Sequence, residues 1–68
     1  MDAKKLGKKI KLARVELDLT QEGLASLIGS LQKNISLYER GSTLPTLDTL
    51  EKISKALKKP YSYFLDEI

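Results

Sequence analysis

This 68-residue chain contains neither cysteine nor histidine. Without cysteine it forms no disulfide and offers no thiolate to a metal, which fits a reducing compartment. Without histidine it lacks the usual general base and the commonest nitrogen ligand for metals. Both absences argue against catalysis, so we expect no enzymatic activity, no metal site and no cofactor.

Long apolar runs are also missing from the sequence. No segment approaches the roughly 20 apolar residues that cross a bilayer. The N-terminal lysines are not followed by the apolar core of a signal peptide. We therefore expect a cytoplasmic protein that forms a single domain over residues 1–68, with a core that uses nearly every apolar residue.

The net charge of +3 is unevenly distributed along the chain. The cations of the first fourteen residues are Lys4, Lys5, Lys8, Lys9, Lys11 and Arg14. The acidic residues Asp66 and Glu67 lie near the other end. A polarised basic domain favours a polyanionic partner, although such a run of lysines is also typical of a solvated helix face.

Glycine and proline divide the sequence into five predicted helices. We predict them over residues 3–17, 21–28, 31 or 32–39, 46–57 and 60–66. Asp18 tolerates the left-handed conformation just past a helix end. Thr20 is a good N-cap, because its hydroxyl accepts from free backbone N–H groups of the next turn. Gly29 suits the turn between the second and third helices.

The apolar residues of each predicted helix fall on one face. For the first helix, the predicted stripe is Leu6, Ile10, Ala13 and Leu17. For the fourth helix, the predicted core residues are Leu47, Leu50, Ile53, Ala56 and Leu57. In the fifth helix the packing candidates are Tyr61, Phe64 and Leu65.

Residues 20–41, TQEGLASLIGSLQKNISLYERG, describe two short helices joined by a tight turn. The residues that this pair must bury are Leu24, Ala25, Ile28, Ile35 and Tyr38. The residues left pointing outward are Gln21, Gln32, Lys33, Ser36, Leu37 and Arg40. Leu31 is spaced to pack with Ile35 and Tyr38, so we expect it to be a packing residue.

Several segments occur in the order and spacing of a known family. They are GKKIKLAR (7–14), LTQEGLA (19–25), Gly29, Gln32, Ile35 with Ser36, ERG (39–41), Pro45 and LDTLEKISKAL (47–57). Over residues 6–65 the chain resembles the helix-turn-helix domain of lambdoid phage repressors, Cro proteins and xenobiotic-response-element-type regulators. The resemblance implies an all-α, compact five-helix lambda repressor-like fold. Its second and third helices would form a helix-turn-helix at about residues 20–40.

The resemblance also implies that the third helix enters the DNA major groove. The expected base contacts are Gln32, Lys33, Ser36 and Leu37. A glutamine pairs with adenine and a lysine donates to guanine, whereas Leu37 can touch a thymine methyl group. Ser36 can instead pack near the helix crossing. Leu37 can instead be a plain exposed leucine or contact a protein.

Phosphate contacts set the register of a protein on DNA without reading its sequence. The expected contacts are Thr20, Gln21, Asn34, Arg40, Ser42 and Thr43. Gln21 starts a helix, where free N–H groups favour phosphate. Its amide can also bond that of Gln32. Arg14 and Glu39 are expected to form a structural ion pair, as the matching positions do in the family.

The predicted function is sequence-specific binding of double-stranded DNA by a transcriptional regulator, with repression as the expected activity. A symmetric dimer would supply enough contacts, and its candidate surface is the Leu44–Pro45 loop with Tyr61, Tyr63 and Ile68. The two tyrosines can instead simply cover the core. The alternative function is a protein-interaction module, such as an antitoxin or adaptor. The chain can equally be the N-terminal part of a longer regulator.

Overall fold

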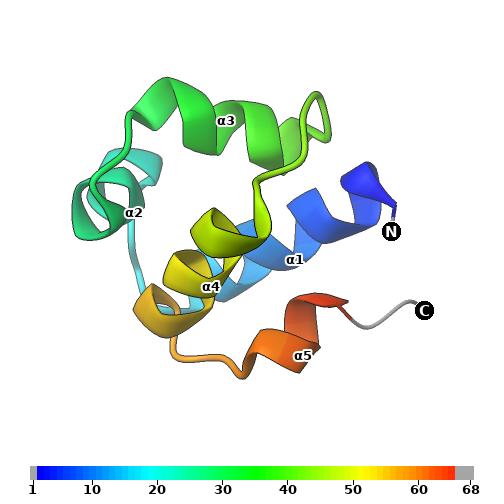
Figure 1. The fold of residues 1–68 in the computed structure, drawn as a ribbon. Helices are drawn as coiled ribbons and strands as arrows, with labels where there is room; N and C mark the ends of the chain where they lie inside the picture. Colours follow the sequence, from blue (N-terminus) through cyan, green and yellow to red (C-terminus); the bar gives the residue numbers. More distant parts are fainter. Residues whose placement is uncertain (1, 66–68) are drawn as a thin grey trace.

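A computed structural model describes residues 2–65, and these residues form five helices and no strand (Figure 1). The helices are α1 (Ala3–Glu16), α2 (Gln21–Ile28), α3 (Gln32–Arg40), α4 (Leu47–Ala56) and α5 (Tyr61–Leu65). The all-α, five-helix prediction is confirmed, and the helix ends agree with it to within a residue or so. The predicted end of the fifth helix, residue 66, lies outside the described residues.

Local capping explains where the first helix begins and ends. The Asp2 carboxylate accepts from the backbone N–H groups of Lys4 and Lys5, at 2.9 and 3.2 Å, which satisfies two of the donors left free at a helix start. At the other end, Asp18 adopts the left-handed conformation with φ of 57°, as predicted. Leu17 was predicted to be buried, and this was wrong, because α1 ends before it and the residue is 37% exposed.

The turn between α2 and α3 also follows from short-range chemistry. Thr20 caps α2 by accepting from the Gly23 N–H at 2.9 Å, and Gly29 ends α2 with φ of 67°, both as predicted. Leu31 precedes α3 with extended backbone and gives it no side-chain cap. The expectation that Leu31 packs inward was wrong. Its extended backbone takes it off the apolar stripe of α3, so it is 66% exposed.

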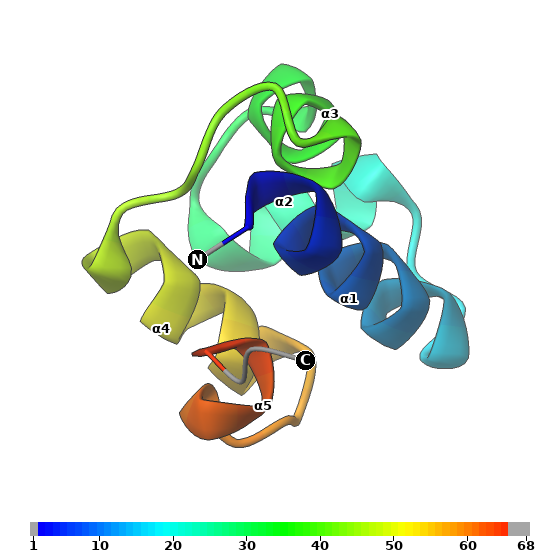
Figure 2. The ribbon, with the colours of Figure 1, turned by 90° about the vertical axis from the view of Figure 1, so that its right-hand side faces the viewer.

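All five helices contribute to one apolar core. The fully buried members are Leu6, Ile10, Ala13, Leu24, Ala25, Ile35, Leu50, Ile53, Leu57 and Phe64. Ile28, Tyr38 and Ala56 are half-buried against this core. The prediction that Leu47 is buried was wrong, since the residue is 65% exposed. It opens α4 directly after an exposed loop, and this first turn lies at the outer edge of the molecule in Figure 2.

Helix α1 packs against both α3 and α5, which lie at opposite ends of the molecule in two perpendicular views (Figures 1 and 2). The approach of α1 to α3 depends on Gly7. A Cβ atom at this position would lie 2.4 Å from the backbone oxygen of Tyr38, far inside a van der Waals contact. This glycine therefore lets the C-terminal half of α3 rest directly on α1, which fixes the orientation of α3.

Candidate nucleic-acid interface

Helix α3 has one buried side and one accessible side. Ile35 is fully buried and anchors the helix to the core. Gln32 and Lys33 are exposed on the first turn, and Arg40 is exposed on the last. Ser36 and Leu37 were predicted to point outward, but the structure shows both half-buried. The accessible side therefore carries an amide and two cations, with a hydroxyl and a leucine partly within reach of a partner.

A hydrogen-bonded chain of side chains supports Gln32 from behind. Its amide nitrogen donates to the side-chain oxygen of Gln21, at 3.1 Å. The amide nitrogen of Gln21 in turn donates to a Glu39 carboxylate oxygen, at 3.0 Å. Because each contact uses a specific end of an amide, the chain sets the orientation of both glutamines. It connects the start of α3 to the start of α2 and to the end of α3.

Arg14 anchors this chain in α1. The guanidinium donates from Nε and Nη2 to the two Glu39 carboxylate oxygens, at 2.6 and 3.0 Å, and from Nη1 to the Leu19 carbonyl, at 2.6 Å. The Arg14 and Glu39 side chains are 10% and 4% exposed. The hydrogen bonds that Arg14 donates to Glu39 raise the pKa of Arg14 above its ordinary value, so the charge is permanent. The predicted ion pair is therefore present.

The residues predicted to meet phosphates lie in two groups. Thr20 and Gln21 lie at the start of α2, and both are already engaged, Thr20 as the cap and Gln21 in the hydrogen-bonded chain. Exposed Arg40, Ser42 and Thr43 follow one another at the end of α3. Asn34 belongs to neither group.

Asn34 is half-buried, and its amide donates to the Ser30 hydroxyl, at 3.0 Å. It therefore braces the turn that leads into α3.

Nothing in the sequence indicated the bond between Gln21 and Glu39. These residues are 18 positions apart, and no periodicity connects them.

Other kinds of site find no support among the described residues. Within residues 2–65, no three side chains of histidine, cysteine, aspartate or glutamate come together as a metal site would require. None of the helices described is long and apolar enough to cross a membrane.

The pairing of α2 with α3, together with the accessible polar side of α3, defines a helix-turn-helix domain. The chain belongs to the Helix-turn-helix family, which matches residues 10–64. The transcriptional repressor RstR of cryptic phage CTXphi, from Vibrio cholerae, is 37% identical over 59 residues. An uncharacterized transcriptional regulator of Rhodospirillum rubrum is 36% identical over 63 residues.

These matches cover 87% and 93% of this chain but 53% and 58% of the two relatives, so the chain spans little more than half their length. Two solved structures share the fold. The P22 c2 repressor, in complex with a synthetic operator, has a TM-score of 0.83 at 32% identity and covers 87% of this chain and 89% of its own. The restriction-modification controller protein C.AhdI of Aeromonas hydrophila has a TM-score of 0.88 at 28% identity, covering 93% and 91%.

Proposed function

We propose that this domain binds double-stranded DNA in a sequence-specific manner and regulates transcription as a repressor, with α3 in the major groove. The main observation behind this proposal is the exposed start of α3, where the side chain of Gln32 is held by that of Gln21. A major groove about 12 Å wide admits one helix. The repressor and regulator relatives, and the operator complex of the P22 c2 repressor, support the same function.

In this proposal the first turn of α3 reads bases. The Gln32 amide bonds N6 and N7 of adenine, and Lys33 donates to O6 or N7 of guanine. Ser36 reaches a base edge or a phosphate from the next turn of the helix. Leu37 touches a thymine methyl group with the exposed part of its side chain.

Phosphate contacts come from both ends of the helix pair. Free N–H groups at the start of α2, beside Thr20 and Gln21, favour an anion. Arg40 supplies a cation at the end of α3, and the Ser42 and Thr43 hydroxyls follow it. Asn34 can join them when its amide leaves Ser30. These contacts would position α3 without reading sequence.

We further propose that two copies bind as a symmetric pair on half-sites about one helical turn apart. The candidate surface is the Leu44–Pro45 loop with Tyr61 and Tyr63. Leu44 is 48% exposed. Two lysine ammonium groups of its own chain already lie 5.3 and 5.0 Å from the Tyr63 ring centroid, so Tyr61 and the loop are the stronger candidates. Ile68 lies outside the described residues.

Selection of binding sites from a library of random DNA duplexes tests the proposal. A palindromic consensus is the expected result, because a symmetric pair reads each half-site in the same way. Affinity for the selected duplex should fall steeply as salt rises, since phosphate contacts release counterions. Recovery of no consensus, with weak binding insensitive to salt, would refute DNA binding and favour the protein-interaction alternative, for which exposed Leu31 is an available contact.

A further inference from the structure

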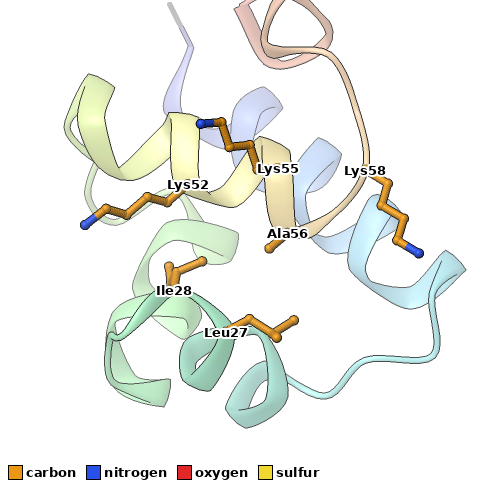
Figure 3. A pocket seen from close by; sticks show the side chains of 6 residues that line it. All are labelled: Leu27, Ile28, Lys52, Lys55, Ala56 and Lys58. Carbon is orange, nitrogen blue, oxygen red and sulfur yellow. The ribbon is translucent and has the colours of Figure 1, made fainter.

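A shallow groove of about 600 Å³ lies between the end of α2 and the second half of α4 (Figure 3). Its apolar residues are Leu27, Ile28 and Ala56, and its polar residues are Lys52, Lys55 and Lys58. None of these residues belongs to α3 or to the hydrogen-bonded chain behind it. The groove is therefore a separate feature from the proposed DNA-reading surface.

The apolar part of the groove continues the core outward. Ile28 and Ala56 are half-buried against the core, and Leu27 is 61% exposed beside them. An isolated exposed leucine is ordinary on a protein surface. Here the leucine forms one wall of a hollow, so an apolar side chain entering the hollow would remove it from water.

The charge of the groove has one sign. Lys55 and Lys58 have no ion-pair partner within residues 2–65, and no carboxylate lines the hollow. Lys52 lies 3.6 Å from Asp48, but both side chains are largely exposed, at 58% and 78%, so water screens this pair. Among the described residues, an anionic partner would therefore meet three lysines, of which Lys52 alone has a carboxylate within ion-pair distance.

The lysines are distributed around the hollow and not gathered at one point. Figure 3 shows Lys52 and Lys58 extending to opposite sides of the apolar residues. Lys52 lies within α4, whereas Lys58 follows the end of that helix with a positive φ of 60°. A single carboxylate cannot reach both ammonium groups, whereas a peptide with acidic residues on either side of an apolar one can. A nucleic-acid backbone carries phosphates but nothing to fill the apolar hollow.

We propose that this groove binds an acidic, amphipathic peptide segment of a partner protein. An apolar side chain of that segment packs between Leu27 and Ala56. Carboxylates on either side of it pair with Lys52 and Lys58, and Lys55 lies between them in the sequence. Because the groove leaves α3 uncovered, this interaction is compatible with DNA binding and does not depend on it.

Peptides for the test come from a displayed library of random peptides, selected on the wild-type chain. The expected consensus contains acidic residues on both sides of a large apolar residue. The selected peptide is then titrated into ¹⁵N-labelled protein. The backbone amide signals expected to shift are those of Leu27, Ile28 and Ala56. A basic consensus, no consensus, or shifts centred on another surface would overturn the proposal.

Pairs of matched variants test which residues contribute to peptide affinity. Leu27→Gln should weaken the peptide at least about tenfold, whereas Leu12→Gln, at an equally exposed leucine of α1, should change affinity less than about twofold. Lys58→Glu should weaken it about fivefold, and Lys11→Glu, the same charge reversal on α1, should not. All four positions are exposed, so circular dichroism should show folded protein in each case.

Equal losses in a variant and its control would mean general hydrophobic or electrostatic attraction and would refute a defined groove. Titration with a random DNA duplex provides a second check. Shifts of the groove amides with DNA but not with the peptide would assign the lysines to a phosphate backbone instead.

Discussion

Arg14 and Glu39, which are 25 positions apart in the chain, form a two-point ion pair with N–O distances of 2.6 and 3.0 Å. Glu39 also accepts from Gln21, which holds Gln32. One buried carboxylate therefore connects the packing of α1 against α3 to the side chain proposed to read DNA. If Gln32 reads DNA as proposed, stability and recognition both depend on Glu39.

Removing one partner of the pair should destabilise the fold strongly. We expect Arg14→Met and Glu39→Ala each to lower the free energy of unfolding by about 3 kcal/mol, because each leaves the other member of the pair as an uncompensated buried charge. The double variant should lose less than the sum of the two. Chemical denaturation of all four proteins measures this coupling energy, and a value indistinguishable from zero would contradict the finding that the pair acts as a unit.

Two leucines of α4 should differ sharply in their contribution to stability. Leu50→Ala should cost about 2–5 kcal/mol, because Leu50 is 1% exposed and its loss leaves a cavity. Leu47→Ala should change stability by less than about 0.5 kcal/mol, because Leu47 is 65% exposed. Thermal unfolding of both variants gives the comparison. Similar losses at the two positions would mean that the first turn of α4 is covered in solution.

Gln32→Ala should reduce binding to the selected DNA site by about 1–3 kcal/mol and relax the preference at one or two base pairs. The physical reason is the loss of an amide held in place by Gln21. Because Gln32 is exposed, the melting temperature should barely change. A titration of half-site variants measures selectivity, and unchanged selectivity would remove Gln32 from the proposed base contacts.

Arg40→Ala should act differently from Gln32→Ala. Arg40 is exposed at the end of α3, where we propose a phosphate contact. Its loss should weaken specific and random duplexes by a similar factor and should lower the salt slope by about one. A comparison of the two duplexes over a range of salt concentrations decides the role. A loss confined to the specific duplex would assign Arg40 to base reading.

The capping of α1 by Asp2 should make the stability of the fold depend on pH. Hydrogen bonds from the Lys5 and Lys4 backbone N–H groups lower the pKa of Asp2 below its ordinary 3.8. Because the folded pKa is lowered, the charged carboxylate stabilises the fold fully above the unfolded pKa, and this contribution is lost as the pH falls through the folded pKa. Asp2→Asn keeps a capping oxygen but no charge, so the melting temperatures of the two proteins should converge as the pH falls below 3.8 and through the folded pKa of Asp2. A constant difference from neutral to acid pH would contradict this account.

The helix boundaries were predictable because capping acts over a few residues. Thr20 and Gly29 occupy the positions that their chemistry predicts, and so does Asp18 with its positive φ. Burial at helix ends was less predictable. Leu31 and Leu47 have the spacing of core residues, but Leu31 lies before α3 begins. For Leu47, the spacing within α4 contains no information on whether another element covers its first turn.

Part of the candidate site was also predictable from the sequence, and part was not. The family pattern predicted the accessible polar residues of α3 and the pairing of Arg14 with Glu39. The bonds from Gln21 to Glu39 and from Asn34 to Ser30, and the half-burial of Ser36 and Leu37, came from the fold. Each of these depends on distances between helices, and such distances follow from how the core packs.

The sequence by itself determined the class of fold, the extent of each helix and the polar character of α3, because periodicity, caps and glycine turns act locally. Only the tertiary structure decided which leucines stay in water, how the two glutamines are held and where three lysines surround an apolar hollow. These features arise when elements distant in the chain come into contact, and the close approach of α1 to α3 at Gly7 sets the geometry of that contact.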